Sequence, residues 1–166
     1  MEESTSPLLY WAQCLPETGH DDMTQATESP VEILLVEDNP GDVRLLQEAL
    51  KDLRVASHLH VTKDGVEALN FLRRKGRYAD LPRPDILLLD LTMPKKTGLE
   101  LLEEIKNDAE LSSIPVVIVT SSEARSDIDH TLGLYANCYL IKPIDAERLI
   151  LVLRTVKPEV GEVRND

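Results

Sequence analysis

The residues of this chain that could do chemistry are polar side chains that each follow a run of aliphatic residues. They are Glu37-Asp38, Asp90, Thr120 and Lys142-Pro143. Three carboxylates that meet at one place repel one another, and they stay ionised at neutral pH only if a cation compensates them. Because the set holds no His or Cys, its oxygen atoms favour a hard divalent ion, Mg²⁺ or Mn²⁺.

Asp90 has the features of a nucleophile. It is followed by Leu91-Thr-Met-Pro94, a turn that leaves its carboxylate at the rim of a sheet. Carboxylates form acyl phosphates, and such a transfer also needs charge neutralisation and a donor to the phosphoryl oxygens. A divalent ion and Lys142 would supply the first, and the Thr120 hydroxyl the second. The pattern therefore predicts phosphoryl chemistry.

The elements that must position these residues alternate between strands and helices. Three apolar runs, 33–36, 86–89 and 116–119, are uninterrupted, and two, 58–62 and 137–141, are mixed. Uninterrupted runs indicate strands covered by helices on both faces, whereas mixed runs suit strands nearer an edge. Each run precedes a stretch with helical periodicity, so the chain is predicted to be an α/β protein of order (βα)₅ with a parallel sheet.

Right-handed crossovers favour a doubly wound, flavodoxin-like sheet with strand order 2-1-3-4-5, in which ligands bind beyond the carboxyl ends of the strands. Taken singly, an Asp, Thr or Lys at a strand end is typical of a cap, a turn or a solvated side chain. Their joint placement at the ends of four strands is what indicates a functional site.

Helix starts are marked by capping residues. The expected signals are Asn39-Pro40, Asp64 with Glu67, Thr97 with Glu100, Ser122 or Ser126, and Asp145 flanked by an Ile144–Leu149 hydrophobic staple. The basic stretch 73–83 is predicted to be a long loop before the third strand.

Composition narrows the class of protein. The 166 residues carry a net charge of −12, which disfavours a general nucleic-acid binder. Two cysteines, Cys14 and Cys138, form no disulfide framework, and no apolar run approaches the length of a membrane-spanning helix. With no basic region of a secretion signal in the first 30 residues, we expect a cytoplasmic protein with no membrane partner.

Residues 1–30 differ from the remainder, because they carry six acidic and no basic residues. We expect a disordered extension there, although Tyr10-Trp11 could instead form a docking patch. Met23 is an alternative start of the protein. The main domain is expected to span 31–157, followed by a short tail, 158–166.

Four segments together resemble the receiver domain of two-component response regulators, over about residues 31–157. They are Val31-Glu-Ile-Leu-Leu-Val-Glu-Asp-Asn-Pro40, Asp85-Ile-Leu-Leu-Leu-Asp-Leu-Thr-Met-Pro-Lys-Lys-Thr-Gly98, Pro115-Val-Val-Ile-Val-Thr-Ser121 and Tyr139-Leu-Ile-Lys-Pro143. Within that family, the chain is most similar to small stand-alone regulators paired with phytochrome kinases.

The resemblance implies a role for each site residue. Asp90 would be the phosphoacceptor, Asp38 a direct Mg²⁺ ligand and Glu37 a ligand through water. The backbone carbonyl of Thr92 would complete the protein's share of the metal site. Lys142 would pair with the phosphoryl oxygens.

The resemblance also implies a switch. Thr120 would move toward the phosphoryl group and Tyr139 would swing inward behind it, although an edge-strand aromatic with its hydroxyl in water is the plain alternative for Tyr139. The change would reach a face formed by the fourth helix, the fifth strand and the fifth helix. Lys142-Pro143 would be a cis peptide, and Thr92 and Ser122 would tune hydrolysis of the acyl phosphate.

The implied partner is a sensor histidine kinase, and the chain would catalyse only its own phosphorylation and dephosphorylation, without being a turnover enzyme. The apolar segment Leu149–Leu153 predicts a homodimer through the fifth helix and the neighbouring strand. The chain ends about ten residues after that helix, so no DNA-binding module is expected and output would be protein contact.

Three other functions are alternatives. An aspartyl phosphatase usually has a second acid two residues after its nucleophile, where this chain has Thr92. An FMN carrier would need a phosphate loop where the acidic Glu37–Pro40 segment would repel phosphate. A receiver-like module that acts without phosphorylation is disfavoured because none of the five expected site residues is missing.

Overall fold

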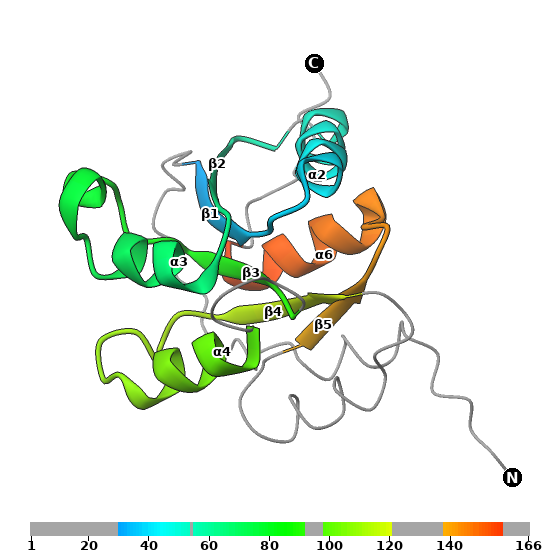
Figure 1. Ribbon diagram of the computed structural model, residues 1–166. Coiled ribbons are helices and arrows are strands. Elements are labelled where there is room, and N and C mark those ends of the chain that lie inside the picture. Colours follow the sequence, from blue (N-terminus) through cyan, green and yellow to red (C-terminus); the bar gives the residue numbers. More distant parts are fainter. Residues whose placement is uncertain (1–29, 54, 92–97, 121–137, 158–166) are drawn as a thin grey trace, which may run out of the picture.

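The strands of the protein form a five-stranded parallel sheet of order β2-β1-β3-β4-β5, as predicted (Figure 1). The computed structural model describes residues 30–53, 55–91, 98–120 and 138–157. The strands are β1 (Val31–Val36), β2 (Ser57–Thr62), β3 (Ile86–Asp90), β4 (Val116–Thr120) and β5 (Cys138–Ile141). The helices are α2 (Pro40–Asp52), α3 (Gly65–Leu72), the short 3₁₀ helix η1 (Gly76–Tyr78), α4 (Gly98–Asn107) and α6 (Ala146–Val156).

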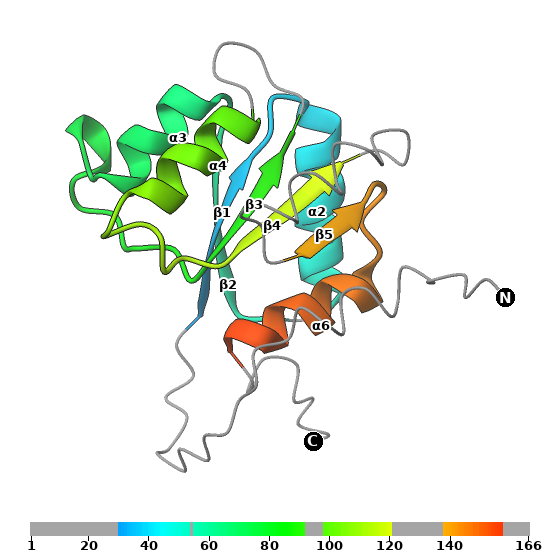
Figure 2. The ribbon, with the colours of Figure 1, turned by 90° about the horizontal axis from the view of Figure 1, so that it is seen from below.

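Helices cover both faces of the sheet: α3 and α4 lie on one side, and α2 and α6 on the other (Figure 2). Side chains of β1 alternate between the two resulting cores, with Leu34 and Val36 facing α3 and α4, and Ile33 and Leu35 facing α2 and α6. Every residue of β3 is buried. This two-sided burial explains why the central strands read as uninterrupted aliphatic runs.

Several predicted helix starts are confirmed by side-chain caps. The Asn39 side chain accepts a hydrogen bond from the Gly41 amide at 2.9 Å, directly before Pro40. Asp64 accepts a hydrogen bond from the Glu67 amide at 2.8 Å, and Asp145 caps α6 by accepting one from the Glu147 amide at 2.9 Å. The expected starts at Thr97, Ser122 and Ser126 lie outside the described residues.

The predicted staple of α6 is consistent with its packing, since Leu149 is fully buried in a core cluster against which Ile144 also packs. None of the helices in the described part of the chain is long and apolar enough to cross a membrane.

The 73–83 stretch contains more structure than the predicted loop. It includes the 3₁₀ turn η1, whose Tyr78 is buried with its ring centroid 5.3 Å from that of Phe71. The Tyr78 hydroxyl donates a hydrogen bond to Glu67 at 2.9 Å. An aromatic anchor with a satisfied hydroxyl therefore ties this stretch to the core.

The two ends of the described domain meet at the amino edge of the sheet. The Lys157 ammonium donates a hydrogen bond to the backbone oxygen of Pro30 at 3.1 Å and lies 3.3 Å from the Asp85 carboxylate. Asp85 in turn accepts from the Glu32 amide at 2.8 Å. These contacts fasten the end of α6 to the start of β1.

Candidate functional site

The polar residues named in the sequence lie at the carboxyl edge of the sheet. Glu37 and Asp38 directly follow β1, Asp90 is the last residue of β3, and Lys142 directly follows β5. Val36 of β1 aligns with Leu89 of β3, so the acidic pair and Asp90 stand level with each other. The parallel register therefore brings together residues that are far apart in the chain.

Glu37, Asp38 and Asp90 form a group that fits a divalent cation. One carboxylate oxygen from each residue lies within 4.8 Å of the others. Glu37 and Asp90 are buried, whereas Asp38 is exposed to solvent. An all-oxygen donor set with a solvent-facing member suits a hard ion that keeps part of its hydration shell. The Thr92 carbonyl, expected to complete the set, lies outside the described residues.

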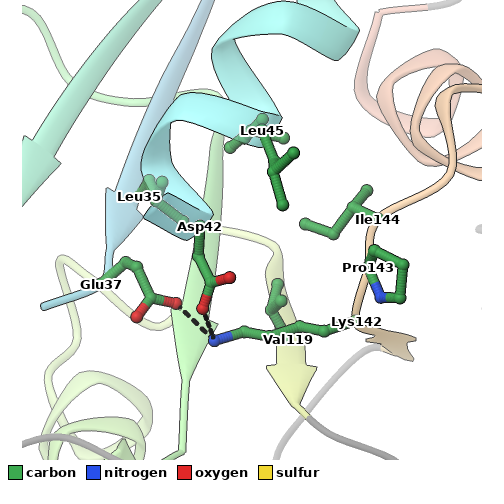
Figure 3. Close-up of a pocket in the computed structure, with 9 residues that line it drawn as sticks. Leu35, Glu37, Asp42, Leu45, Val119, Lys142, Pro143 and Ile144 are labelled. Atoms are coloured by element: carbon green, nitrogen blue, oxygen red, sulfur yellow. Dashed lines mark hydrogen bonds and ion pairs between the residues drawn. The ribbon is translucent and has the colours of Figure 1, made fainter. Parts of the chain in front are cut away.

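The Lys142 ammonium reaches three carboxylates at once. It donates hydrogen bonds to Glu37 at 2.7 Å, to Asp42 at 2.8 Å and to Asp90 at 3.2 Å. Figure 3 shows the first two contacts, with the Lys142 side chain extending from the end of β5 toward α2. An ammonium has three protons to donate, so these acceptors satisfy it completely.

Burial shifts the pKa of both Glu37 and Lys142, and the neighbouring side chains add to this shift or oppose it. Burial raises the pKa of the Glu37 carboxyl and the adjacent Asp90 carboxylate adds to the rise, whereas hydrogen bonds from Lys142 and the Asn39 amide only partly offset it, so the pKa reaches about 7. Burial by itself would lower the pKa of Lys142, but hydrogen bonds to Asp42 and Glu37 and the charge of Asp90 outweigh it and raise the pKa. Lys142 therefore stays a cation at neutral pH.

We expect Glu37→Gln to stabilise the metal-free protein as pH rises. Between the ordinary value of 4.5 and about 7, the folded wild type holds a proton that the unfolded chain has lost, so wild-type stability falls with rising pH. Gln cannot lose that proton. In the presence of a chelator, the variant's advantage in free energy of unfolding should grow from about pH 5 to about pH 8, to at most about 3 kcal/mol.

Urea unfolding of both proteins across that pH range measures this advantage. Addition of Mg²⁺ provides the control, because the cation should stabilise the wild type at about pH 8 and stabilise the variant much less. Parallel pH profiles for the two metal-free proteins would contradict the raised pKa.

Other predicted site residues lie near the same edge. Thr120 is buried at the end of β4, and its backbone oxygen accepts a hydrogen bond from the Lys142 amide at 2.8 Å. The Lys142–Pro143 peptide bond is cis, as the resemblance implies. Tyr139 of β5 is half-buried against the core that α3 and α4 cover. The expected inward movement of Tyr139 stays a prediction, and Ser122 lies outside the described residues.

Sequence reasoning missed Asp42. It lies in the first turn of α2, two residues after Pro40, where an acidic side chain can point back toward the strand end that precedes the helix. That position was the available signal, since acidic residues are favoured in a first turn. The contact with Lys142 joins residues 100 positions apart, which no local pattern indicates.

Gly98 holds the first turn of α4 against the backbone of the site. Its amide donates a hydrogen bond to the Leu91 oxygen at 3.3 Å. A Cβ atom at this position would lie 2.5 Å from the backbone carbonyl oxygen of Asp90 and 2.7 Å from the Leu91 Cα. Only glycine permits α4 to start this close to the residue that carries the central carboxylate.

Comparison with known proteins identifies the class. The family model for the response regulator receiver domain matches residues 33–154, and the chain therefore belongs to the response regulator receiver family of two-component signalling. Among similar curated proteins is the response regulator Rcp1 of Synechocystis sp., 40% identical over 135 residues that cover 81% of this chain and 92% of the relative.

Solved structures place the chain near phytochrome-associated response regulators. The phosphorylated cyanobacterial phytochrome response regulator RcpA is 43% identical, with a TM-score of 0.66 over 77% of this chain and 91% of its own. The Mn²⁺-bound form of Rcp1 is 41% identical, with a TM-score of 0.65 over 78% of this chain and 94% of its own.

Proposed function

We propose that this protein is a phosphorylation-dependent switch that accepts a phosphoryl group from the phosphohistidine of a sensor kinase onto Asp90. The observation that carries the proposal is the position of Asp90, which ends the central strand between two further carboxylates and a lysine ammonium. Two similar proteins support it, because RcpA has been solved in a phosphorylated form and Rcp1 with Mn²⁺ bound.

The transfer uses an Asp90 carboxylate oxygen as the nucleophile. A bond forms between that oxygen and phosphorus, while the P–N bond of the phosphohistidine breaks and its electron pair returns to the imidazole, which takes a proton. Hydrolysis reverses the modification: a water oxygen bonds to phosphorus, the P–O bond to Asp90 breaks, and inorganic phosphate leaves. The chain thus turns over only its own phosphoryl group.

The surrounding residues would hold and neutralise the incoming group. A cation bound by Glu37, Asp38 and Asp90, for which we propose Mg²⁺, would supply positive charge to the phosphoryl oxygens. Lys142, which lies 3.2 Å from Asp90, contributes a second positive charge and hydrogen bonds. The Thr120 hydroxyl is a further donor in the proposal.

The partners follow from this chemistry. We propose a histidine kinase as the phosphoryl source, of the phytochrome type because RcpA is described as a phytochrome response regulator. Output would be a changed contact with another protein in the cytoplasm, through the surface that includes β5 and α6. The homodimer stays a prediction: the core buries Leu149, Val152 and Leu153, and leaves Ile150 and Leu151 partly exposed on α6.

Incubation with phosphoramidate tests the proposal. In the presence of Mg²⁺, intact mass measurement should show one phosphoryl group added per chain, and the modified fraction should decay after the donor is removed. A chelator should prevent the addition, because the three carboxylates would then repel the incoming anion. An unmodified protein at saturating donor and Mg²⁺ would favour a receiver-like module that acts without phosphorylation.

A further inference from the structure

Asp42 is a contact of the site lysine that does not belong to the metal-binding group. The carboxylate oxygens that converge within 4.8 Å come from Glu37, Asp38 and Asp90. Asp42 approaches Lys142 from the first turn of α2 at 2.8 Å, with 31% of its side chain exposed. Its position allows it to act on the lysine without sharing a cation with the other three.

The hydrogen bonds of Lys142 show what an incoming phosphoryl group must compete with. The contacts with Glu37 and Asp42, at 2.7 and 2.8 Å, are shorter than the 3.2 Å contact with Asp90. All three ammonium protons have acceptors, so a bond to a phosphoryl oxygen requires that one acceptor be released.

The three acceptors differ in how a bound cation would affect them. A cation held by Glu37 and Asp90 would withdraw charge from those carboxylates and would weaken their hydrogen bonds to the ammonium. Asp42 lies outside that group and keeps its full attraction. With the cation bound, the Asp42 contact would therefore be the main restraint on Lys142 when the phosphoryl group arrives.

The surroundings strengthen this restraint. A cavity of about 20 Å³ lies beside the pair, lined on its apolar side by Leu35, Val119 and Ile144 (Figure 3). The Lys142 side chain is only 21% exposed. Solvent therefore screens this ion pair less than it screens a pair on an open surface.

We propose that Asp42 is a positioning residue, which holds Lys142 in its resting orientation and sets how readily the site accepts a phosphoryl group. This inference rests on the proposed phosphotransfer to Asp90. Removal of the Asp42 charge frees the ammonium to bind the phosphoryl oxygens. The phosphorylated form then becomes more stable relative to the resting form.

Beryllofluoride, a non-covalent mimic of a phosphoryl group, tests the proposal in the full-length protein. In saturating Mg²⁺, Asp42→Asn should bind beryllofluoride about three- to tenfold more tightly than the wild type, as measured by calorimetry. The matched control is Asp52→Asn, the same chemical change at the exposed far end of α2, about 15 Å away along the helix. It should leave the affinity unchanged.

A double-mutant cycle shows whether Asp42 acts through Lys142. In a Lys142→Ala background, Asp42→Asn should lose its effect on beryllofluoride affinity. An effect that persists there would overturn the proposal in favour of direct repulsion between Asp42 and the anion. Unchanged or weaker binding by Asp42→Asn in the otherwise wild-type protein would also overturn it. A wild type that binds no beryllofluoride would instead overturn the proposed function.

Discussion

Asp90→Asn is expected to abolish phosphoryl incorporation from phosphoramidate, with a fall in rate of at least about a hundredfold. The amide lacks the anionic oxygen that attacks phosphorus, and no other carboxylate takes its place at the end of the central strand. Of the described carboxylates near the cation position, Asp38 is exposed, and Glu37 is held by Lys142 at 2.7 Å. The measurement is the intact mass over a time course in Mg²⁺.

The variant should remain folded, because it removes one of three mutually repelling charges while keeping the shape of the buried side chain. Thermal unfolding in a chelator should therefore show a midpoint no lower than that of the wild type. Asp52→Asn is the matched control and should incorporate phosphoryl groups at the normal rate. Full modification of Asp90→Asn would assign the phosphoacceptor to a different residue.

Gly98→Ala is expected to cost about 3 kcal/mol of stability or more. The new Cβ would clash with two backbone atoms, the carbonyl oxygen of Asp90 at 2.5 Å and the Cα of Leu91 at 2.7 Å. Backbone atoms cannot relieve the clash by a change of rotamer, as the end of a flexible side chain can. Either α4 or the end of β3 must therefore shift. A shift of β3 would also move the Asp90 carboxylate away from its partners, and phosphoryl incorporation should then fall under conditions where the variant is still folded.

Gly41→Ala provides the comparison for this substitution. A Cβ at that position would approach only the Asn39 side-chain oxygen, at 3.2 Å, on the exposed first turn of α2. Because Ala favours a helix more than Gly does, the free energy of unfolding should change by about 1 kcal/mol at most. Urea unfolding of the two variants measures both effects, and equal stabilities would refute the close contact at Gly98.

The architecture could be predicted because its signals are local. The aliphatic runs at 33–36, 86–89 and 116–119 correspond to strands buried on both faces, and Asn39 and Asp64 cap the helices that follow β1 and β2. Right-handed crossovers then leave few topologies for five parallel strands. The 3₁₀ turn at Gly76–Tyr78 escaped prediction because it depends on packing of Tyr78 against Phe71, which is a tertiary contact.

The residues of the candidate site could be predicted, but the contacts between their side chains could not. Parallel strands carry their final residues to one edge, so residues at strand ends, such as Asp90 and Lys142, are placed by topology alone. The three hydrogen bonds of the Lys142 ammonium could not be predicted, because they depend on the directions of side chains that come from separate elements. Asp42 enters the site through that geometry rather than through any motif.

The bond between Lys157 and Pro30 has a practical consequence for experiments on this protein. Pro30 and Lys157, the first and last described residues, both lie at the start of β1. The carboxylates of the site lie at the other end of the strands. Six residues of extended strand separate the two edges by about 20 Å. Fluorophores, fusion partners or immobilisation handles joined directly to residue 30 or residue 157 would therefore lie at the edge opposite the site.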